Sequence, residues 1–424
     1  MSREPVGISD MSLYVPPWRI DLEDILARRA AEDPSFERRL RRAIDSTDQK
    51  AIRFPAGWQD SVTLATQAAH PLLTDPDRAA GVRYFAVGTE TAVDMSKPIA
   101  AYAQGALQRA GLAVPRTLST FQVQHACAGG TIAMLSVAGM LSCTGRDGES
   151  GIVVSSDVAR YKTPSTAEIT QGAGAVAMRI SCSPELLELE TDTVGFASAD
   201  EDDFFRPLGS VTARVKGRYS VDCYNDALNA ALSDHAERAG MSPREALDKH
   251  DMYVVHVPFY RMAVTGMTKI LERHMDMDHA SAQEFLAGRH FFEGIEAARW
   301  IGNIYSGSAY MSLMFLLYNR YRELGEGIVG QRILLASYGS GNTMTVLSAR
   351  VAERAPEVLA RWDLDAVLDA ATPAGFDMYE RFVGRETYSL DHGPVTDGHE
   401  VPAGSYFLRD IREDGYRIYD FKAE

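Results

Sequence analysis

The chain has 424 residues, of which 46% are hydrophobic and 24% charged, a composition typical of soluble globular proteins. The formal net charge of −15 argues against a nucleic-acid partner, because neutralising phosphates requires a strongly basic surface. Residues 1–17 lack the long apolar stretch of a secretory signal. The longest nearly apolar run, Thr131–Cys143, is too short to cross a membrane, so we expect a cytoplasmic protein with no membrane partner.

Strand-like and helix-like segments alternate along the first half of the chain, a pattern that predicts an α/β fold. We expect a strand at 6–14, a charged surface helix at 22–42, a helix at 61–73, a strand at 82–87, a helix at 97–110, a strand at 119–124, an apolar helix at 130–143, and strands at 151–156 and 173–180.

The second half has a similar order of elements. Helices are expected at 219–239 and 309–324, and strands at 252–257 and 332–337. The acidic stretch 195–203 is a candidate crossover between the halves, and no low-complexity linker separates them. We therefore predict two similar halves that pack as one body.

The segment FQVQHACAGGT, residues 121–131, is the most informative local feature. A strand-like run reaches Cys127, two glycines follow, and an apolar helix begins. Gly129 and Gly130 permit a tight strand-to-helix turn, which would place the sulfur at a helix N-terminus. Backbone N–H groups there favour a thiolate and can stabilise an oxyanion. A small buried cysteine at a glycine turn also fits this segment, so both interpretations stay open on this pattern alone.

The other three cysteines, Cys143, Cys182 and Cys223, lack this setting and are expected to be packing residues. The chain contains no CxxC pair and no Cys/His cluster at zinc spacing, so no metal site is predicted. Four cysteines in a chain of this length do not make a disulfide framework.

Two further segments carry candidate acid and base groups. Glu90 follows the strand at 82–87 in VGTETAVDMSKP, where burial would raise the carboxyl pKa and suit a general base. His256 closes the strand at 252–257 in YVVHVPFYRM, a position that suits proton transfer near neutral pH. A solvated loop glutamate and a satisfied core histidine are the alternatives for these two residues.

Two glycine-containing segments, IGNIYSGSAY at 301–310 and ASYGSGN at 336–342, place small and polar residues after apolar runs. They could supply backbone donors and a side-chain amide to a thioester oxygen, or they are simple turns. Neither matches a nucleotide-binding glycine pattern.

Taken together and in this order, these segments resemble the 3-hydroxy-3-methylglutaryl-CoA synthase family. The matching stretches lie between about residues 82 and 342 and read VGTET…D.SKP, QHACAGGT, SSDVARY, TQGAGAVAM, DDFFRP, GRYSVDCY, HVPFYRM, IGNIYSGSAY and SYGSG. The resemblance implies a thiolase-like αβαβα five-layer fold, built from two pseudo-duplicated halves and dimeric. Residues 1–195 would carry Glu90 and Cys127, and residues 196–424 would carry His256, Asn303 and Ser337.

The resemblance also implies a mechanism and a set of site residues. Cys127 would take an acetyl group from a thioester, and Glu90 would remove a methyl proton from the acetyl-S-cysteine. The resulting carbanion would attack the ketone of an acetoacetyl thioester while His256 donates a proton to the alkoxide, and hydrolysis would release the product. No metal or redox cofactor is implied. The residues implied to bind the substrate are Asn303, Ser337, Tyr161, Thr170 and Gly339, with the backbone N–H groups of Cys127 and Ser337 as the oxyanion hole.

The sequence departs from the family pattern at several places. Ala128 follows the nucleophile where a larger residue is frequent, Ala167-Glu168-Ile169 stands where Gly-Glu-Pro is expected, and Arg261 replaces a frequent lysine. The stretch 32–57 is longer and richer in arginine than usual. These differences leave the acyl acceptor open.

We expect an enzyme that joins acetyl-CoA to acetoacetyl-CoA, as in the mevalonate pathway. The alternative acceptor is an acetoacetyl chain on an acyl carrier protein, as in polyketide β-branching. A ketosynthase or thiolase relative is disfavoured by the Glu90 segment. A non-catalytic scaffold subunit is also disfavoured, because a scaffold needs none of Cys127, Glu90 and His256.

Overall fold

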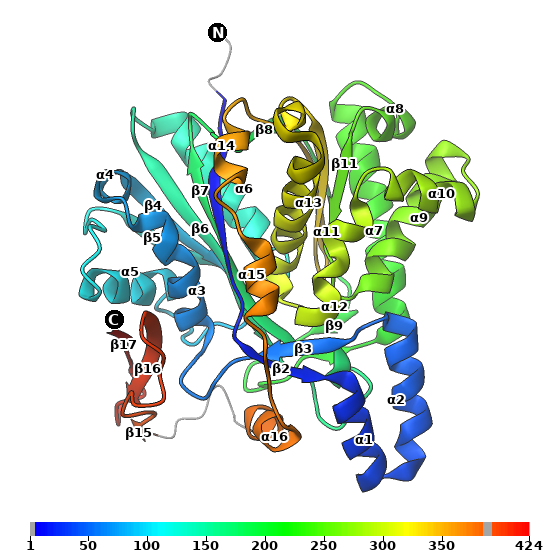
Figure 1. Ribbon diagram of the computed structural model, residues 1–424. Coiled ribbons are helices and arrows are strands. Elements are labelled where there is room, and N and C mark those ends of the chain that lie inside the picture. Colours follow the sequence, from blue (N-terminus) through cyan, green and yellow to red (C-terminus); the bar gives the residue numbers. More distant parts are fainter. Residues whose placement is uncertain (1–4, 385–391, 424) are drawn as a thin grey trace.

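The computed structural model describes residues 5–384 and 392–423, which are built around one nine-stranded mixed sheet (Figure 1). The strand order is β11-β12-β13-β8-β1-β7-β6-β4-β5. The α/β arrangement predicted from the sequence is therefore confirmed, and each expected strand is present within a few residues of its expected bounds. The strands are β1 (Gly7–Tyr14), β4 (Val82–Gly88), β5 (Ser119–Val123), β6 (Ser150–Ala159), β7 (Gly172–Ser181), β8 (Leu187–Ser198), β11 (Met252–Val255), β12 (Arg332–Gly339) and β13 (Thr343–Val351).

The two ends of the sheet share one pattern. In the N-terminal half, β4 runs parallel to β6, and β6 runs antiparallel to β7. In the C-terminal half, β11 runs parallel to β12, and β12 runs antiparallel to β13. The two patterns meet where β1 pairs with β8 at Gly7 and Ile8. The two ends of the sheet therefore repeat the same sequence of strand directions.

The predicted crossover at 195–203 is partly wrong. Residues 195–198 belong to β8, because Gly195 pairs with Val346 and Ser198 pairs with Thr343 of β13. A division of the chain between residues 195 and 196 would therefore cut a central strand. The acidic residues of this stretch, 200–203, follow the end of the strand and led the predicted crossover to extend back over residues 195–198.

Helices cover the sheet on both halves, and two of them meet at the centre of the molecule (Figure 1). Thr131 of α6 and Tyr310 of α13 have their hydroxyl oxygens 2.7 Å apart. Within the described residues, Ala126–Thr144 is the one segment long and apolar enough to cross a membrane, and more than half of it is buried in the protein. The long helices are α3 (Ser61–Ala69), α5 (Ile99–Arg109), α6 (Gly129–Thr144), α7 (Gly217–Arg238), α9 (Tyr260–Met275) and α13 (Ser308–Leu324).

The helix predicted at 22–42 is in fact a pair, α1 (Leu22–Glu32) and α2 (Pro34–Thr47). Pro34 cannot continue a helix because it lacks a backbone N–H. Asp33 instead caps α2 by accepting a hydrogen bond from the Ser35 backbone N–H at 2.9 Å. The pair is also not purely a surface feature, since Leu26 and Leu40 are buried.

The chain is completed by shorter elements around this framework. They are β2 (Trp18–Asp21), β3 (Ala51–Phe54), α4 (Pro76–Ala80), β9 (Phe204–Phe205), β10 (Arg214–Val215), α8 (Pro243–Asp248), α10 (His279–Ala287), α11 (Phe291–Glu296), α12 (Ala298–Ile301), α14 (Ala355–Leu359), α15 (Leu364–Asp369), β14 (Thr372–Pro373), α16 (Phe376–Gly384), β15 (Gly393–Pro394), β16 (Ser405–Ile411) and β17 (Arg417–Lys422).

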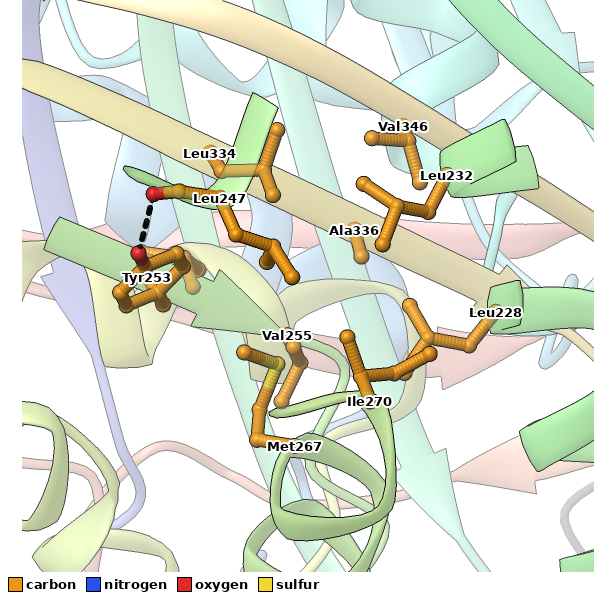
Figure 2. A pocket seen from close by; sticks show the side chains of 11 residues that line it. Leu228, Leu232, Leu247, Tyr253, Val255, Met267, Ile270, Leu334, Ala336 and Val346 are labelled. Atoms are coloured by element: carbon orange, nitrogen blue, oxygen red, sulfur yellow. Dashed lines mark hydrogen bonds between the residues drawn. The ribbon is translucent and has the colours of Figure 1, made fainter. Parts of the chain in front are cut away.

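The C-terminal half has a sealed apolar core between α7, α9, β11, β12 and β13. Figure 2 shows aliphatic side chains such as Leu228, Ile270 and Val346 converging there, and the void between them measures about 10 Å³. The Tyr253 hydroxyl donates to the Leu247 carbonyl at 2.6 Å, so its polar group is satisfied. A space this small holds one water at most and cannot accept a substrate.

The last described strands return to the N-terminal half. β16 packs on α3 and β17 packs on α5 (Figure 1). Asp60 joins them: its Oδ1 accepts from the Val62 backbone N–H at 3.0 Å and so caps α3. Its Oδ2 accepts from Arg417 at 3.0 Å and from the Tyr419 hydroxyl at 2.7 Å. The start of α3 is therefore fixed by residues far along the chain.

Candidate active site

Cys127 lies in a tight turn between β5 and α6, as the sequence predicted. The turn is made at Ala126, whose φ of 42° lies in the left-handed region that residues with a side chain rarely adopt. The Ala128 backbone N–H donates to the His125 carbonyl at 3.0 Å and closes the turn. Strained backbone of this kind gathers at functional sites. The cysteine side chain ends up buried, at 7% exposure.

The glycines after Cys127 act differently from the prediction. They do not form the turn; they begin α6, and neither has a positive φ. They are needed because the helix touches two strands. A Cβ on Gly130 would lie 2.0 Å from the Ser155 Oγ on β6, and a Cβ on Gly88 of β4 would lie 2.1 Å from the Gly130 nitrogen. The close approach carries the nucleophile to the ends of β4 and β6.

Glu90 is brought directly to the sulfur. The Cys127 thiol donates to Glu90 Oε2 at 3.8 Å, and Arg206 Nη2 donates to Glu90 Oε1 at 2.5 Å. Burial raises the pKa of Glu90 to about 7, against the opposing effect of the Arg206 charge. A carboxyl with this pKa can give or take a proton at neutral pH.

The protonation of Cys127 differs from the prediction. Burial raises the pKa of the thiol well above its ordinary value, and the neighbouring Glu90 charge raises it further. The helix N-terminus was expected to favour a thiolate, but desolvation outweighs it. In this closed site the cysteine is therefore a thiol that donates its proton toward Glu90.

Asp157 organises the backbone around the base. Its Oδ1 accepts from Thr89 Oγ1 at 2.9 Å, the Glu90 backbone N–H at 2.9 Å and Thr91 Oγ1 at 2.8 Å. Its Oδ2 accepts from the Ser306 backbone N–H at 3.1 Å and hydroxyl at 2.5 Å. This buried carboxylate joins the loop after β4 to the start of the 3-10 turn Tyr305–Gly307. Both of its oxygens are occupied, so it holds the site together.

Three aromatic rings line the space beside Cys127. Tyr161, Phe204 and Tyr305 belong to the same buried cluster as the cysteine. Each pair of rings meets edge to face, with centroids 6.0 to 6.5 Å apart. Tyr161 was predicted here, whereas Phe204 and Tyr305 were not. The buried hydroxyl of Tyr305 lies beside Tyr161, so polar groups as well as ring edges face this space.

The end of β12 packs on the nucleophile turn, as the predicted roles of Ser337 and Gly339 require. Thr131 Oγ1, one turn beyond Cys127, donates to Ser337 Oγ at 2.7 Å. A Cβ on Gly339 would lie 2.7 Å from the Ala128 Cβ. The Ser337 side chain is thus engaged with α6.

His256 lies at the end of β11, beside the end of β12. Its backbone N–H donates to the Ala336 carbonyl at 2.8 Å, and the residue as a whole is 2% exposed. Burial lowers the pKa of His256 to about 3, so the imidazole is neutral at pH 7. Among the described residues no hydrogen bond joins this ring to Cys127 or Glu90. The structure therefore brings Cys127 and Glu90 into contact. His256 is bonded to β12, and the end of β12 packs on the turn that holds Cys127.

Asn303 and Thr170 hold each other in place. The Asn303 backbone N–H donates to the Thr170 carbonyl at 3.2 Å. The Asn303 side-chain oxygen accepts from the Tyr305 backbone N–H at 2.8 Å and from Ser308 Oγ at 3.0 Å. Since this oxygen is occupied, Asn303 can offer a substrate its amide N–H groups.

Sequence reasoning gave no role to Asp157, Arg206, Phe204 or Tyr305. One usable signal was the polar run Ser155-Ser156-Asp157 inside β6, because a carboxylate in a fully buried strand requires several donors. Arg206 in the DDFFRP segment offered no such signal, because its partner Glu90 is 116 residues away in the sequence.

Comparison with known proteins agrees with this geometry. Residues 51–185 match the family model "Hydroxymethylglutaryl-coenzyme A synthase N terminal", and residues 293–422 match "Hydroxymethylglutaryl-coenzyme A synthase C terminal". The hydroxymethylglutaryl-CoA synthase of Enterococcus faecalis is 30% identical over 386 residues, covering 91% of this chain and 93% of that protein.

Two solved structures extend the match to the fold. MvaS in complex with 3-hydroxy-3-methylglutaryl coenzyme A superposes with a TM-score of 0.83 at 32% identity, covering 99% of each chain. The curacin-pathway HMG synthase in complex with acetyl donor-ACP gives 0.85 at 21% identity, covering 98% of this chain and 100% of that one. The predicted thiolase-like αβαβα fold is thereby confirmed. These family-model, sequence and structure matches place the chain in the hydroxymethylglutaryl-CoA synthase family of condensing acyltransferases.

Proposed function

We propose that the enzyme transfers an acetyl group to Cys127 and condenses it, with Glu90 as base, onto an acetoacetyl thioester. The contact between the Cys127 thiol and Glu90 Oε2, at 3.8 Å in a buried site, is the observation that carries this proposal. An acetyl group on the sulfur would place its methyl carbon within reach of the same carboxylate oxygen. The product is a 3-hydroxy-3-methylglutaryl thioester.

The steps balance as proton and acyl transfers. The Cys127 thiol gives its proton to Glu90 as the sulfur attacks the donor thioester, and Glu90 passes this proton to the departing thiolate, which leaves as a free thiol. Glu90 then takes a proton from the acetyl methyl group, and the electron pair left on carbon attacks the acceptor ketone. Water finally cleaves the bond between the product and Cys127. No step requires a metal or redox cofactor.

His256 is proposed to act on the acceptor's ketone oxygen. Because its pKa is about 3, the imidazole is neutral at pH 7 and offers an N–H rather than the spare proton of an imidazolium. We propose that this N–H donates a hydrogen bond to the oxygen, and that the proton follows as negative charge develops there.

Acetyl-CoA and acetoacetyl-CoA are the proposed substrates. The support is the Enterococcus faecalis hydroxymethylglutaryl-CoA synthase at 30% identity and the MvaS structure that contains 3-hydroxy-3-methylglutaryl coenzyme A. Both cover more than nine tenths of this chain.

A carrier-protein-bound acceptor is the second candidate, favoured by one surface feature. Arg38, Arg39 and Arg42 of α2 are exposed on a chain whose net charge is −15. Asp48 at the end of α2 pairs with Arg299 at 2.8 Å, which ties this helix to α12. Such a basic face suits an acidic protein partner, and the curacin relative shares the fold.

Mass spectrometry of the Cys127 peptide after incubation with acetyl-CoA tests the first step. The expected result is an acetyl-sized mass increase on that peptide, and its absence would refute the proposal. Condensation is then measured with acetoacetyl-CoA and with an acetoacetyl carrier protein. An Arg38/Arg39/Arg42→Ala variant should raise KM for the carrier alone if the second candidate is right, with the CoA substrate as internal control.

We further propose a homodimer. The sheet ends at β5, which pairs with β4 alone among the described strands and so offers an open edge. Light scattering on the purified protein would test this. The cytoplasmic location and a place in the mevalonate pathway stay predictions.

A further inference from the structure

The two buried carboxylates at the site differ in what their oxygens contact. Both oxygens of Asp157 are occupied by hydroxyl and backbone donors. Glu90 divides its contacts: Oε1 accepts from Arg206 at 2.5 Å, while Oε2 faces the Cys127 sulfur at 3.8 Å. Oε2 of Glu90 is therefore the carboxylate oxygen turned toward the place where an acetyl group would sit.

An ionised carboxylate in this position needs a cation nearby. The Glu90 side chain is 6% exposed and the Arg206 side chain 12%, so the pair is largely removed from water. Removing a carboxylate from water without a compensating charge strongly favours its neutral form. The negative charge of Asp157 on the adjacent strand acts in the same direction.

Arg206 reaches Glu90 from the other half of the chain. The segment before it is anchored by Asp203, which accepts from the Gly341 backbone N–H at 2.9 Å and the Tyr338 hydroxyl at 2.8 Å. Phe204, two residues from Arg206, packs against Tyr305 in the aromatic wall beside Cys127. The same short segment thus forms part of the acyl pocket and delivers the guanidinium.

We infer that Arg206 is a positioning residue for the base: it holds Oε1 of Glu90, keeps the carboxyl ionised and aims Oε2 at the methyl group of acetyl-S-Cys127. This inference rests on the proposed function. In the step concerned, a methyl C–H bond breaks, an O–H bond forms at Oε2, and the electron pair stays on the acetyl group as an enolate. Arg206 keeps its own protons throughout, because a guanidinium is not deprotonated in proteins.

The test uses the full-length enzyme, acetylated with acetyl-CoA in D₂O over a range of pH. Deuterium entering the acetyl methyl group is measured by mass spectrometry of the Cys127 peptide, a readout that reports proton abstraction directly. Wild type should exchange fastest above about pH 7, where Glu90 is ionised. Arg206→Gln should move the midpoint of this profile upward by about 1–3 pH units, the usual effect of losing an adjacent cation.

Two further variants separate positioning from structural damage. Arg206→Lys keeps the charge but not the planar fork, so it should lower the exchange rate with a smaller shift of midpoint. Arg332→Gln removes another Arg–Glu pair, with Glu190, near the opposite end of β12 and should leave the profile unchanged. A midpoint in both Arg206 variants equal to that of wild type would overturn the inference.

A failure of the proposed function would give a different exchange result from a failure of the inference about Arg206. If wild type incorporates no deuterium, or if Glu90→Gln incorporates it normally, Glu90 is not the base and the proposed function falls. If Glu90→Gln fails to exchange while Arg206→Gln exchanges with the wild-type profile, the role of Arg206 alone is refuted.

Discussion

The two halves of the molecule hold their candidate catalytic residues in different ways. In the N-terminal half, Glu90 is fixed by hydrogen bonds and charges from Arg206, Asp157 and the Cys127 thiol. In the C-terminal half, His256 is fixed by burial at the end of β11, with its backbone bonded to β12. Burial, opposed by the Arg206 charge, sets the protonation of Glu90, whereas burial alone sets that of His256.

This difference explains why one residue can change its proton near neutral pH and the other cannot. For Glu90, burial and the Arg206 cation oppose each other, and the pKa falls at about 7. For His256 burial acts without an opposing charge, and the pKa falls to about 3. A base needs the first kind of site, and a neutral hydrogen-bond donor needs the second.

Removing the cysteine thiol of the N-terminal half should have the largest effect. Cys127→Ala should abolish acetylation and lower turnover on the order of 10⁴-fold or more, since the covalent route is lost. Mass spectrometry and a steady-state assay measure both. Cys223→Ala is the matched control, because Cys223 is equally buried, at 7% exposure, and lies on α7. Normal acetylation in the Cys127 variant would contradict the assignment.

Changing the base should separate the two chemical steps. Glu90→Gln keeps an acceptor for Arg206 but cannot remove a proton, so acetyl-enzyme should accumulate while condensation falls about 10²–10⁴-fold. Rapid-quench analysis of the acetylated peptide and of the product measures each step. Condensation at the wild-type rate would refute the role of Glu90.

The pH dependence of turnover distinguishes Glu90 from His256 without any mutation. Glu90 must be deprotonated to act, and its raised pKa of about 7 means that kcat should fall about tenfold per pH unit below pH 7 and level off above it. His256, with a pKa of about 3, should add no limb between pH 5 and 8. A single midpoint near the ordinary glutamate value of 4.5 would show that burial does not control the base.

The hydrogen-bond network on the N-terminal side should also matter for stability. In Asp157→Asn, one side-chain position changes from acceptor to donor and faces the Ser306 backbone N–H, so a buried donor loses its partner. The expected cost is about 1–3 kcal/mol of unfolding free energy, measured by chemical denaturation. Asp234→Asn is the control, since its Oδ2 accepts one backbone hydrogen bond at the surface.

The C-terminal side should respond to packing instead, with the smallest effect. Ile270→Val in the apolar core of Figure 2 should lower the unfolding free energy by about 0.5–1.5 kcal/mol. Its acetylation and pH profile should match wild type, because the substitution changes no charge near Glu90. A shifted pH profile would mean that packing in this core changes the pKa of Glu90.

Much of the fold could be predicted because the local patterns are strong. Helices and strands such as α6 and β4 were located within two residues, since apolar runs ending at glycine mark them clearly. The prediction failed at Pro34, where charged residues on both sides concealed the end of α1. It also failed at the end of β8, where the acidic residues 200–203 that follow the strand made residues 195–198 resemble part of a loop.

The candidate site was only partly predictable. Glu90 and His256 each follow a buried strand, and Cys127 lies between a strand and a glycine pair, positions that sequence alone reveals. Asp157 and Arg206 depend on partners 67 and 116 residues away, and no local pattern encodes such distances. The pKa values could not be predicted either, because they depend on how completely the three-dimensional fold excludes water from each group.

The bonds from Arg417 and Tyr419 to Asp60 have a consequence for biosynthesis. While the ribosome is still translating the middle of the chain, Asp60 at the start of α3 lacks two of its hydrogen-bond donors, Arg417 and Tyr419. The half that holds the nucleophile is therefore completed after the half that holds the histidine has been made. A nascent chain should resist proteolysis around residue 60 only once β17 has emerged.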